Sequence, residues 1–293
     1  MYAWQPLAMV LAEDEAVAEE AAKLIQLSYE ELPLLLEAED ADAAGEWYVP
    51  ERKIECGNVD AVFASAVHIM EGKTHNSGQE HFYMEGQRCR AIPFEDSRLL
   101  LQCATQSTME VQEVVSHLLG IPAHDIVVEV PRLGGAFGGK ERAATIWASM
   151  AALAAFVCRK PVQVKLTRDE DMRATGKRHP FTSLWKVAYD DKGKILAYDL
   201  QLLANGGAYA DLSVAILERA MFHAENAYHI PNARIRGRAC RTNLPPNTAF
   251  RGFGAPQGIF VIESIMQQIA NKLGLNPLAI RRINAYQNGD ITP

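Results

Sequence analysis

The sequence predicts an α+β fold, because it contains a strand-rich stretch, a hairpin and long apolar helices. Three runs predict an antiparallel set of strands: 67–73, 82–93 and 99–104. Residues 185–203 predict a hairpin whose turn lies at 190–194. Two apolar segments have the length and spacing of buried helices: 141–159 and 256–273. We therefore expect mixed sheets packed with helices.

The N-terminal segment predicts a small strand–helix–strand unit, with strands at 6–11 and 28–36 and a helix at 13–27 whose start is acidic. Such a unit cannot close a core alone. Residues 38–60 are acidic and poor in core residues, which predicts a surface linker.

The remaining elements follow from local signals. Ser107 and Glu110 form a capping-box pattern that opens a helix ending at Gly120. The charged cluster 168–171 predicts a solvated turn, and the proline-containing region 211–250 is expected to be irregular. Four further elements are predicted: a helical turn at 61–66, strands at 126–130 and 162–166, and a final helix at 277–286.

Composition excludes several classes of protein. The chain has 293 residues and a net charge of −7, which argues against a nucleic-acid partner. Apolar runs are too short to cross a membrane, and no basic region follows Met1, so we expect no signal peptide. The five cysteines are scattered, without zinc or iron–sulfur spacing, which predicts reduced thiols in a cytoplasm.

A glycine-rich loop organises the chain: the motif GGAFGGKE at 134–141, placed between a predicted strand and a predicted helix. Glycine lets the backbone approach a ligand closely and adopt positive φ, and N–H groups near a helix start favour an anion or a polarised oxygen. The loop also fits the spacing of a phosphate-binding loop. That alternative fails because Glu141 replaces the Ser or Thr that would hold Mg²⁺, and no convincing strand ends in a metal-binding Asp.

A second glycine cluster, FRGFGAPQ at 250–257, also precedes a predicted helix. The two loops, together with GQEHFY at 78–83, resemble the molybdopterin-binding large subunit of the xanthine dehydrogenase and aldehyde oxidase family. The resemblance covers nearly the whole chain. Ala136 stands where family members often have glycine.

The resemblance implies a molybdenum held by molybdopterin and surrounded by protein groups. Gln79 would hydrogen-bond an oxygen on molybdenum, and the backbone N–H groups of Phe137 and Arg251 would lie against the metal and its ligands. Gly135 and Gly252 would let the main chain reach the cofactor. Taken without the motif, Gln79 is an ordinary loop amide.

The resemblance also implies the substrate. Family members that oxidise purines carry a Glu and an Arg where this chain has Glu141 and Arg219, and an aromatic ring where it has Phe253. A carboxylate and a guanidinium suit the edges of a purine, and Arg219 can stabilise negative charge that develops on it. Alone, Glu141 would be interpreted as a first-turn helix acid and Phe253 as a core residue.

The implied reaction is hydroxylation of a purine such as xanthine or hypoxanthine, in purine catabolism, with water as the oxygen source. Electrons would leave through iron–sulfur clusters and FAD on other domains or subunits. The implied fold is part of an α/β hammerhead domain at 1–37, the linker 38–60, and a first molybdopterin-binding domain at 61–293. The resemblance also implies a second molybdopterin domain, which carries the general-base glutamate. It further implies that the full enzyme is a homo-oligomer.

Two alternatives remain open. The chain could be an inert or structural cofactor-site fragment that needs the second molybdopterin domain, or part of an aldehyde or N-heterocycle oxidase of the same family. No general base can be named on this chain, and we therefore expect it to be one piece of a longer or split subunit.

We predict that the 293-residue chain by itself retains no molybdenum cofactor and does not oxidise xanthine, because the second domain supplies much of the pterin pocket in the family. Elemental analysis of the purified chain and xanthine-dependent dye reduction measure the two properties. Stoichiometric molybdenum or measurable dye reduction would contradict the prediction.

Overall fold

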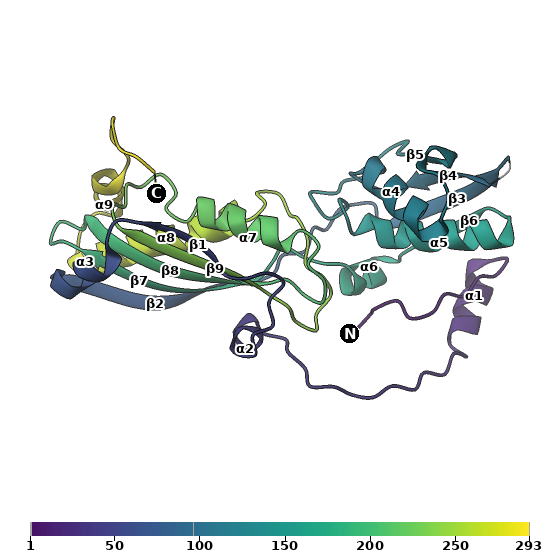
Figure 1. Ribbon diagram of the computed structural model, residues 1–293, viewed down its shortest axis with the longest axis horizontal. Coiled ribbons are helices and arrows are strands. Elements are labelled where there is room, and N and C mark those ends of the chain that lie inside the picture. The colour runs from purple at the N-terminus through teal and green to yellow at the C-terminus, as the bar shows by residue number, and fades with distance from the viewer. Residues whose placement is uncertain (1, 96, 293) are drawn as a thin grey trace. The chain divides into compact units, whose positions relative to one another are not determined.

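The computed structural model describes residues 2–95 and 97–292, which form two compact units (Figure 1). Unit 1 comprises three segments: Met1–Leu34, Glu80–Lys177 and Asn243–Thr248. Unit 2 comprises three others: Leu35–Gln79, Arg178–Thr242 and Ala249–Pro293. Each unit has its own sheet and its own hydrophobic core, so each is described by itself.

Unit 1 is built on a four-stranded mixed sheet in the order β5-β4-β3-β6. Its strands are β3 (Arg88–Phe94), β4 (Arg98–Cys103), β5 (Ile126–Glu129) and β6 (Val162–Lys165). The central strand β3 is antiparallel to β4 and β6, whereas β5 runs parallel to β4. Along β3 buried and exposed residues alternate from Arg88 to Ala91, so one face of the sheet is core and the other carries polar side chains.

Helices α4 (Thr108–Leu119) and α5 (Ala144–Cys158) pack on the buried face of this sheet. Helix α5 buries a row of alanines, which lets it lie close to the strands. It is less completely buried than its composition suggests, because Ile146 and Leu153 remain exposed. Helix α4 ends at Gly120, whose φ of 65° is the left-handed conformation that glycine adopts without strain.

The remaining helices of unit 1 are short: α1 (Glu15–Ala22), the 3₁₀ turn η1 (Ala123–Asp125) and α6 (Arg168–Ala174). Helix α6 begins with a capping box in which the Thr167 hydroxyl accepts from the Glu170 N–H and the Glu170 carboxylate accepts from the Thr167 N–H. The predicted solvated turn at 168–171 is therefore a helix start, and its last residue, Asp171, is buried.

Unit 2 is built on a five-stranded mixed sheet in the order β1-β9-β8-β7-β2. The strands are β1 (Arg52–Cys56), β2 (His68–Asn76), β7 (Phe181–Tyr189), β8 (Ile195–Asn205) and β9 (Ala233–Cys240). All neighbours are antiparallel except β8 and β9, which run parallel. A parallel pair needs a crossover, and helix α7 (Ser213–Phe222) supplies it.

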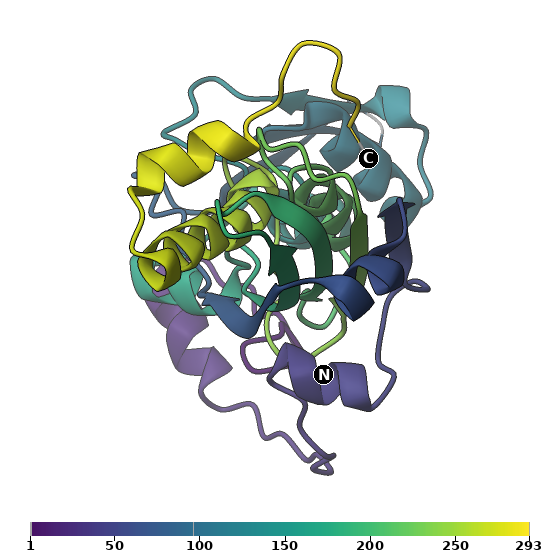
Figure 2. The same cartoon turned by 90° about the vertical axis from the view of Figure 1, so that its left-hand side faces the viewer.

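Helices cover both faces of this sheet (Figure 2). The main core lies between strands β7, β8 and β9 and helices α7 and α8 (Ala255–Leu273), with α9 (Pro277–Asn284) packed on α8. On the opposite face, α3 (Val59–Ser65) and α2 (Ala38–Ala43) form two small clusters with the strands. No described helix is long and apolar enough to span a bilayer.

Glycine is required where α8 meets α7. A Cβ at Gly254 would lie 2.1 Å from the Ile216 carbonyl oxygen, and one at Gly258 would lie 2.2 Å from the Ala220 carbonyl oxygen. Real Cβ contacts are never that short, so any larger residue at either position would force α8 away from α7.

The predicted α+β class with mixed sheets packed with helices is confirmed, and so are the hairpin at 185–203 and the helices that end the chain. The antiparallel set predicted from 67–104 is wrong in one respect. Strand β2 pairs with β7 in the sheet of unit 2, and only β3 and β4 pair with each other. The region 211–250 was expected to be irregular, but it contains α7 and β9. The arginines that alternate with apolar residues along β9 masked its strand pattern.

Three further local expectations are wrong. Residues 6–11 and 28–36 form no strand, since neither pairs with another strand within residues 2–95 and 97–292. The expected linker 38–60 contains α2 and the edge strand β1. The Ser107 side chain makes no capping hydrogen bond; instead Glu110 pairs with Arg142 at 3.3 Å.

Candidate functional site

The second glycine loop, in unit 2, is held by residues with positive φ: Gly252 at 99°, Phe253 at 51° and Gly254 at 102°. Its turn is closed by the Phe253 N–H, which donates to the Phe250 carbonyl at 2.8 Å. The Arg251 N–H has no acceptor among the described residues. The Phe253 side chain is half-buried against the core of unit 2, so it is partly a core residue as well as a loop residue.

The Gln79 side chain lies beside this loop, and Arg178 joins the two. The Arg178 Nε donates to Gln79 Oε1 at 2.9 Å, and its Nη2 donates to the Arg251 carbonyl at 3.0 Å. The Arg178 backbone N–H donates to the Gln79 carbonyl at 3.0 Å. The guanidinium also stacks on the Phe250 ring, 4.0 Å from its centroid. Sequence analysis missed Arg178, because nothing in its local pattern distinguishes it from a surface arginine.

One nitrogen of Arg178 is buried without a partner. Its Nη1 makes no hydrogen bond within the part of the chain that the structure describes, and burial lowers the pKa of the guanidinium. Leaving a buried donor without a hydrogen bond is costly.

Arg219 lies on helix α7, which packs directly on the second glycine loop through Gly254 and Gly258. Its side chain is exposed and forms no ion pair among residues 2–95 and 97–292, whereas its neighbour Glu218 pairs with Arg52 at 2.9 Å. The Arg219 charge is therefore not paired with any carboxylate of the described residues.

The first glycine loop, in unit 1, also has positive φ at three residues: Gly135 at 86°, Phe137 at 55° and Gly138 at 106°. Gln106 Oε1 accepts from the Gly138 N–H at 3.0 Å, which anchors the far side of the loop. The Phe137 N–H has no acceptor in residues 2–95 and 97–292, and the Phe137 ring is 49% exposed. The main chain at Gly135 and Phe137, including the Phe137 N–H group, is therefore available for contact with a ligand.

Lys140 is fully buried, and its Nζ donates to the Glu85 carbonyl at 2.6 Å and lies 4.4 Å from the centroid of the Tyr83 ring. Burial lowers the pKa of its ammonium group. Its charge points into the protein, where it cannot reach a phosphate, and helix α5 begins only at Ala144. This geometry confirms that the loop is not a nucleotide phosphate loop.

A buried hydrogen-bond network holds the first glycine loop in place. Asp171 accepts from the Tyr83 hydroxyl and from the Gln87 N–H, both at 2.7 Å, and Gln87 Nε2 donates to the Gly139 carbonyl at 2.9 Å. Burial, together with the Asp171 carboxylate, raises the pKa of the Tyr83 hydroxyl, so it remains a donor. The position of the loop therefore depends on a fully hydrogen-bonded carboxylate.

Glu141 precedes helix α5 by three residues, so its interpretation as a first-turn acid of that helix is wrong. It is partly buried, and burial raises the pKa of its carboxyl, an effect that the nearby Arg142 only partly offsets.

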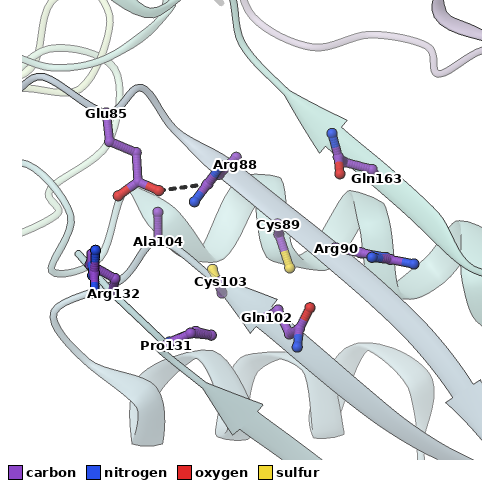
Figure 3. Close-up of a pocket in the computed structure, with 10 residues that line it drawn as sticks. All are labelled: Glu85, Arg88, Cys89, Arg90, Gln102, Cys103, Ala104, Pro131, Arg132 and Gln163. Atoms are coloured by element: carbon purple, nitrogen blue, oxygen red, sulfur yellow. Dashed lines mark ion pairs between the residues drawn. The ribbon is translucent and has the colours of Figure 1, made fainter. Parts of the chain in front are cut away.

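A separate pocket of about 270 Å³ opens on unit 1 beside the loop (Figure 3). None of the residues predicted from sequence lines it. Its lining comes from strands β3, β4 and β6 and from the segment after β5, and includes the Glu85–Arg88 ion pair at 2.6 Å. The Glu85 carboxylate also accepts from the Gly134 N–H at 2.7 Å, so one wall of the pocket is a support of the glycine loop.

The structure thus brings together Gln79, Arg251, Gly252, Phe253 and the helix of Arg219 within unit 2. Gly135, Phe137 and Glu141 form a second group within unit 1. No group of three or more His, Cys, Asp or Glu side chains in the described residues could hold a bare metal ion.

Comparison with known proteins gives the family. A family model described as Molybdopterin cofactor-binding domain matches residues 42–285. The chain is 45% identical to xanthine dehydrogenase of Emericella nidulans over 291 residues, which are 99% of this chain and 21% of that protein. It is 44% identical to aldehyde oxidase 2 of Cavia porcellus over 290 residues, which are 98% of this chain and 22% of that protein.

Among solved structures, the aldehyde oxidoreductase of Desulfovibrio gigas matches with a TM-score of 0.87 and 30% identity, over 96% of this chain and 32% of that chain. Quinoline 2-oxidoreductase of Pseudomonas putida matches with a TM-score of 0.83 and 27% identity, over 96% of this chain and 37% of that chain. The chain spans about a fifth of the length of the curated relatives it matches.

We predict that Asp171→Asn lowers the free energy of unfolding by about 1–3 kcal/mol, because an amide would place a donor against the Tyr83 hydroxyl or the Gln87 N–H. Asp169→Asn on the same helix is the matched control. It removes only an exposed ion pair with Arg173 and should change stability by less than about 1 kcal/mol. Urea denaturation measures both, and equal losses would contradict the prediction.

Proposed function

The chain belongs to the molybdopterin cofactor-binding domain family of xanthine dehydrogenases and aldehyde oxidases, and on this basis we propose that it forms part of the molybdenum site of a hydroxylase that acts on a purine such as xanthine or hypoxanthine. When bound, the molybdenum-molybdopterin group supplies the oxidation chemistry that adds oxygen from water to a carbon atom.

The residues of this chain fit such a group. The cofactor brings oxygen and sulfur acceptors with its metal, and the chain offers donors without protein partners among the described residues. These are the backbone N–H groups of Phe137 and Arg251 and the NH₂ group of Gln79. Glycines flank both backbone donors, so main chain can approach closely. These residues would hold the cofactor without ligating the metal through side chains.

The substrate roles fall to Glu141, Arg219 and Phe253. The Glu141 carboxylate would accept from a ring N–H of the purine, and Arg219 would stabilise negative charge that develops on the ring as the carbon is attacked. Phe253 would pack on the flat face of the substrate. The observation that carries the purine proposal is that the chain presents both a partly buried carboxyl and an unpaired guanidinium in the parts of the molecule that hold the two glycine loops.

An aldehyde or N-heterocycle oxidase is the second candidate. Identity does not separate the two, since a xanthine dehydrogenase and an aldehyde oxidase match almost equally, at 45% and 44%. The charged pair at Glu141 and Arg219 favours the purine, because an uncharged pocket suits simple aldehydes better. An inert cofactor-site segment is the third candidate.

The proposal extends to the rest of the assembly. A second molybdopterin domain would supply the general base, and iron–sulfur and FAD domains or subunits would carry electrons away. We propose a cytoplasmic homo-oligomeric enzyme, in which residues 1–37 belong to an α/β hammerhead domain and 61–293 to the first molybdopterin domain. The one-fifth share of its relatives' length supports a larger assembly.

We predict that, in the assembled enzyme, Arg219→Met lowers kcat/KM for xanthine roughly a hundred-fold or more, because a charged donor to the developing anion is lost. Glu141→Val should cost about 1–3 kcal/mol in the same quantity, since purine N–H groups would be left unpaired. Both variants should keep or gain turnover of an aromatic aldehyde.

The measurement is the ratio of kcat/KM for xanthine to that for the aldehyde. The exposed residues Arg282 and Glu113 provide matched controls, Arg282→Met and Glu113→Val, whose ratios should equal that of the wild type. If the ratio is also unchanged in the Arg219 and Glu141 variants, these two residues do not recognise the substrate.

A further inference from the structure

We propose that Arg178 is a positioning residue that fixes the orientation of the Gln79 side-chain amide and thereby turns its NH₂ group toward the bound cofactor. The inference rests on the proposed function and assigns to that site a residue that sequence analysis missed. It is carried by the contacts of Arg178 within unit 2.

The chemistry of the two side chains leaves one orientation. An arginine side chain carries only donors, whereas a glutamine amide has one acceptor oxygen and one donor NH₂ group. The Arg178 Nε lies 2.9 Å from Gln79 Oε1, so the oxygen must face the guanidinium. The opposite orientation would set the NH₂ group of Gln79 against the Arg178 Nε–H, two donors with no acceptor between them.

The NH₂ group of Gln79 is therefore on the side away from Arg178. It makes no hydrogen bond to any described residue, and the Gln79 side chain is exposed. In water alone an exposed glutamine amide would sample both orientations. Arg178 converts it into a fixed donor, which suits an oxygen on a cofactor and disfavours a cation.

Arg178 can hold this orientation because it is itself fixed on three sides. Its backbone N–H donates to the Gln79 carbonyl, its Nη2 donates to the Arg251 carbonyl at 3.0 Å, and its guanidinium stacks on Phe250. Its Nη1 lies beside Gly252, where a Cβ would be 4.0 Å away. One planar fork therefore ties the Gln79 segment to the glycine loop, which a lysine could not do with a single ammonium group.

The first test uses the 293-residue chain without cofactor. In chain labelled with ¹⁵N-glutamine, the Gln79 side-chain signal is assigned by its loss in Gln79→Glu. We expect Arg178→Met to move this signal to the position of a free glutamine amide, and Arg178→Lys to move it part of the way. The control Arg282→Met should leave it in place. A Gln79 signal that is the same in wild type and in Arg178→Lys would overturn the proposal, even if Arg178→Met does not fold.

The second test uses the assembled, cofactor-loaded enzyme. If Arg178 acts only through Gln79, substituting Arg178 should not lower kcat further once Gln79 has been replaced. We expect Arg178→Met to lower kcat about 10- to 100-fold with KM changed less than about 3-fold, and the double variant with Gln79→Met to be no slower than Gln79→Met alone. Losses that multiply in the double variant would overturn the positioning role.

The two tests separate this inference from the proposed function. If wild-type enzyme hydroxylates no purine or aldehyde, the proposed function fails. The NMR result on the bare chain then still decides whether Arg178 orients the Gln79 amide.

Discussion

The site depends on two backbone N–H groups, those of Phe137 and Arg251, which have no acceptor among residues 2–95 and 97–292. Leaving a backbone donor unpaired is unfavourable unless water or a ligand completes it. Each of these donors lies in a glycine loop that has positive φ at three residues, a backbone conformation that residues other than glycine rarely adopt. Such a loop packs poorly in a core, whereas its exposed N–H groups can donate to a ligand.

A cation at each loop donates to a main-chain carbonyl: the fully buried Lys140 in unit 1 and the half-buried Arg178 in unit 2. In unit 1 the Lys140 ammonium donates to the Glu85 carbonyl, while Asp171 and Gln87 hold the neighbouring turn. In unit 2 the Arg178 guanidinium donates to the Arg251 carbonyl and to Gln79. A cation with no acceptor capacity fixes a carbonyl and leaves the adjacent N–H groups to point elsewhere. Lys140 and Arg178 thus have structural roles, and neither needs to touch a substrate.

Much of the fold could be predicted from local patterns. The helices 256–273 and 277–286 and the strand at 126–130 carry strong periodicity or caps, and the structure has them close to those bounds. Sequence failed where the deciding partner is distant. The pairing of β2 with β7 joins residues more than a hundred apart, and β9 alternates arginine with apolar residues because its charges pair with Asp199, Asp42 and Glu51. The role of Arg178 could not be predicted for the same reason, because it depends on Gln79 and Arg251, which are distant in the sequence. The family could be identified from the glycine motifs, because a close approach of the backbone to a ligand strongly restricts the local sequence.

Residue-resolved amide hydrogen exchange in the assembled enzyme, with and without cofactor, would show whether the two loops present their backbone to the cofactor. We expect the Phe137 and Arg251 N–H groups to exchange fast in the cofactor-free form and much more slowly in the loaded form. The Gly138 N–H, which already donates to Gln106, should change little and serves as the internal control. Equal exchange of the Phe137 and Arg251 amides in the two forms would contradict the claim that these loops present their backbone to the cofactor.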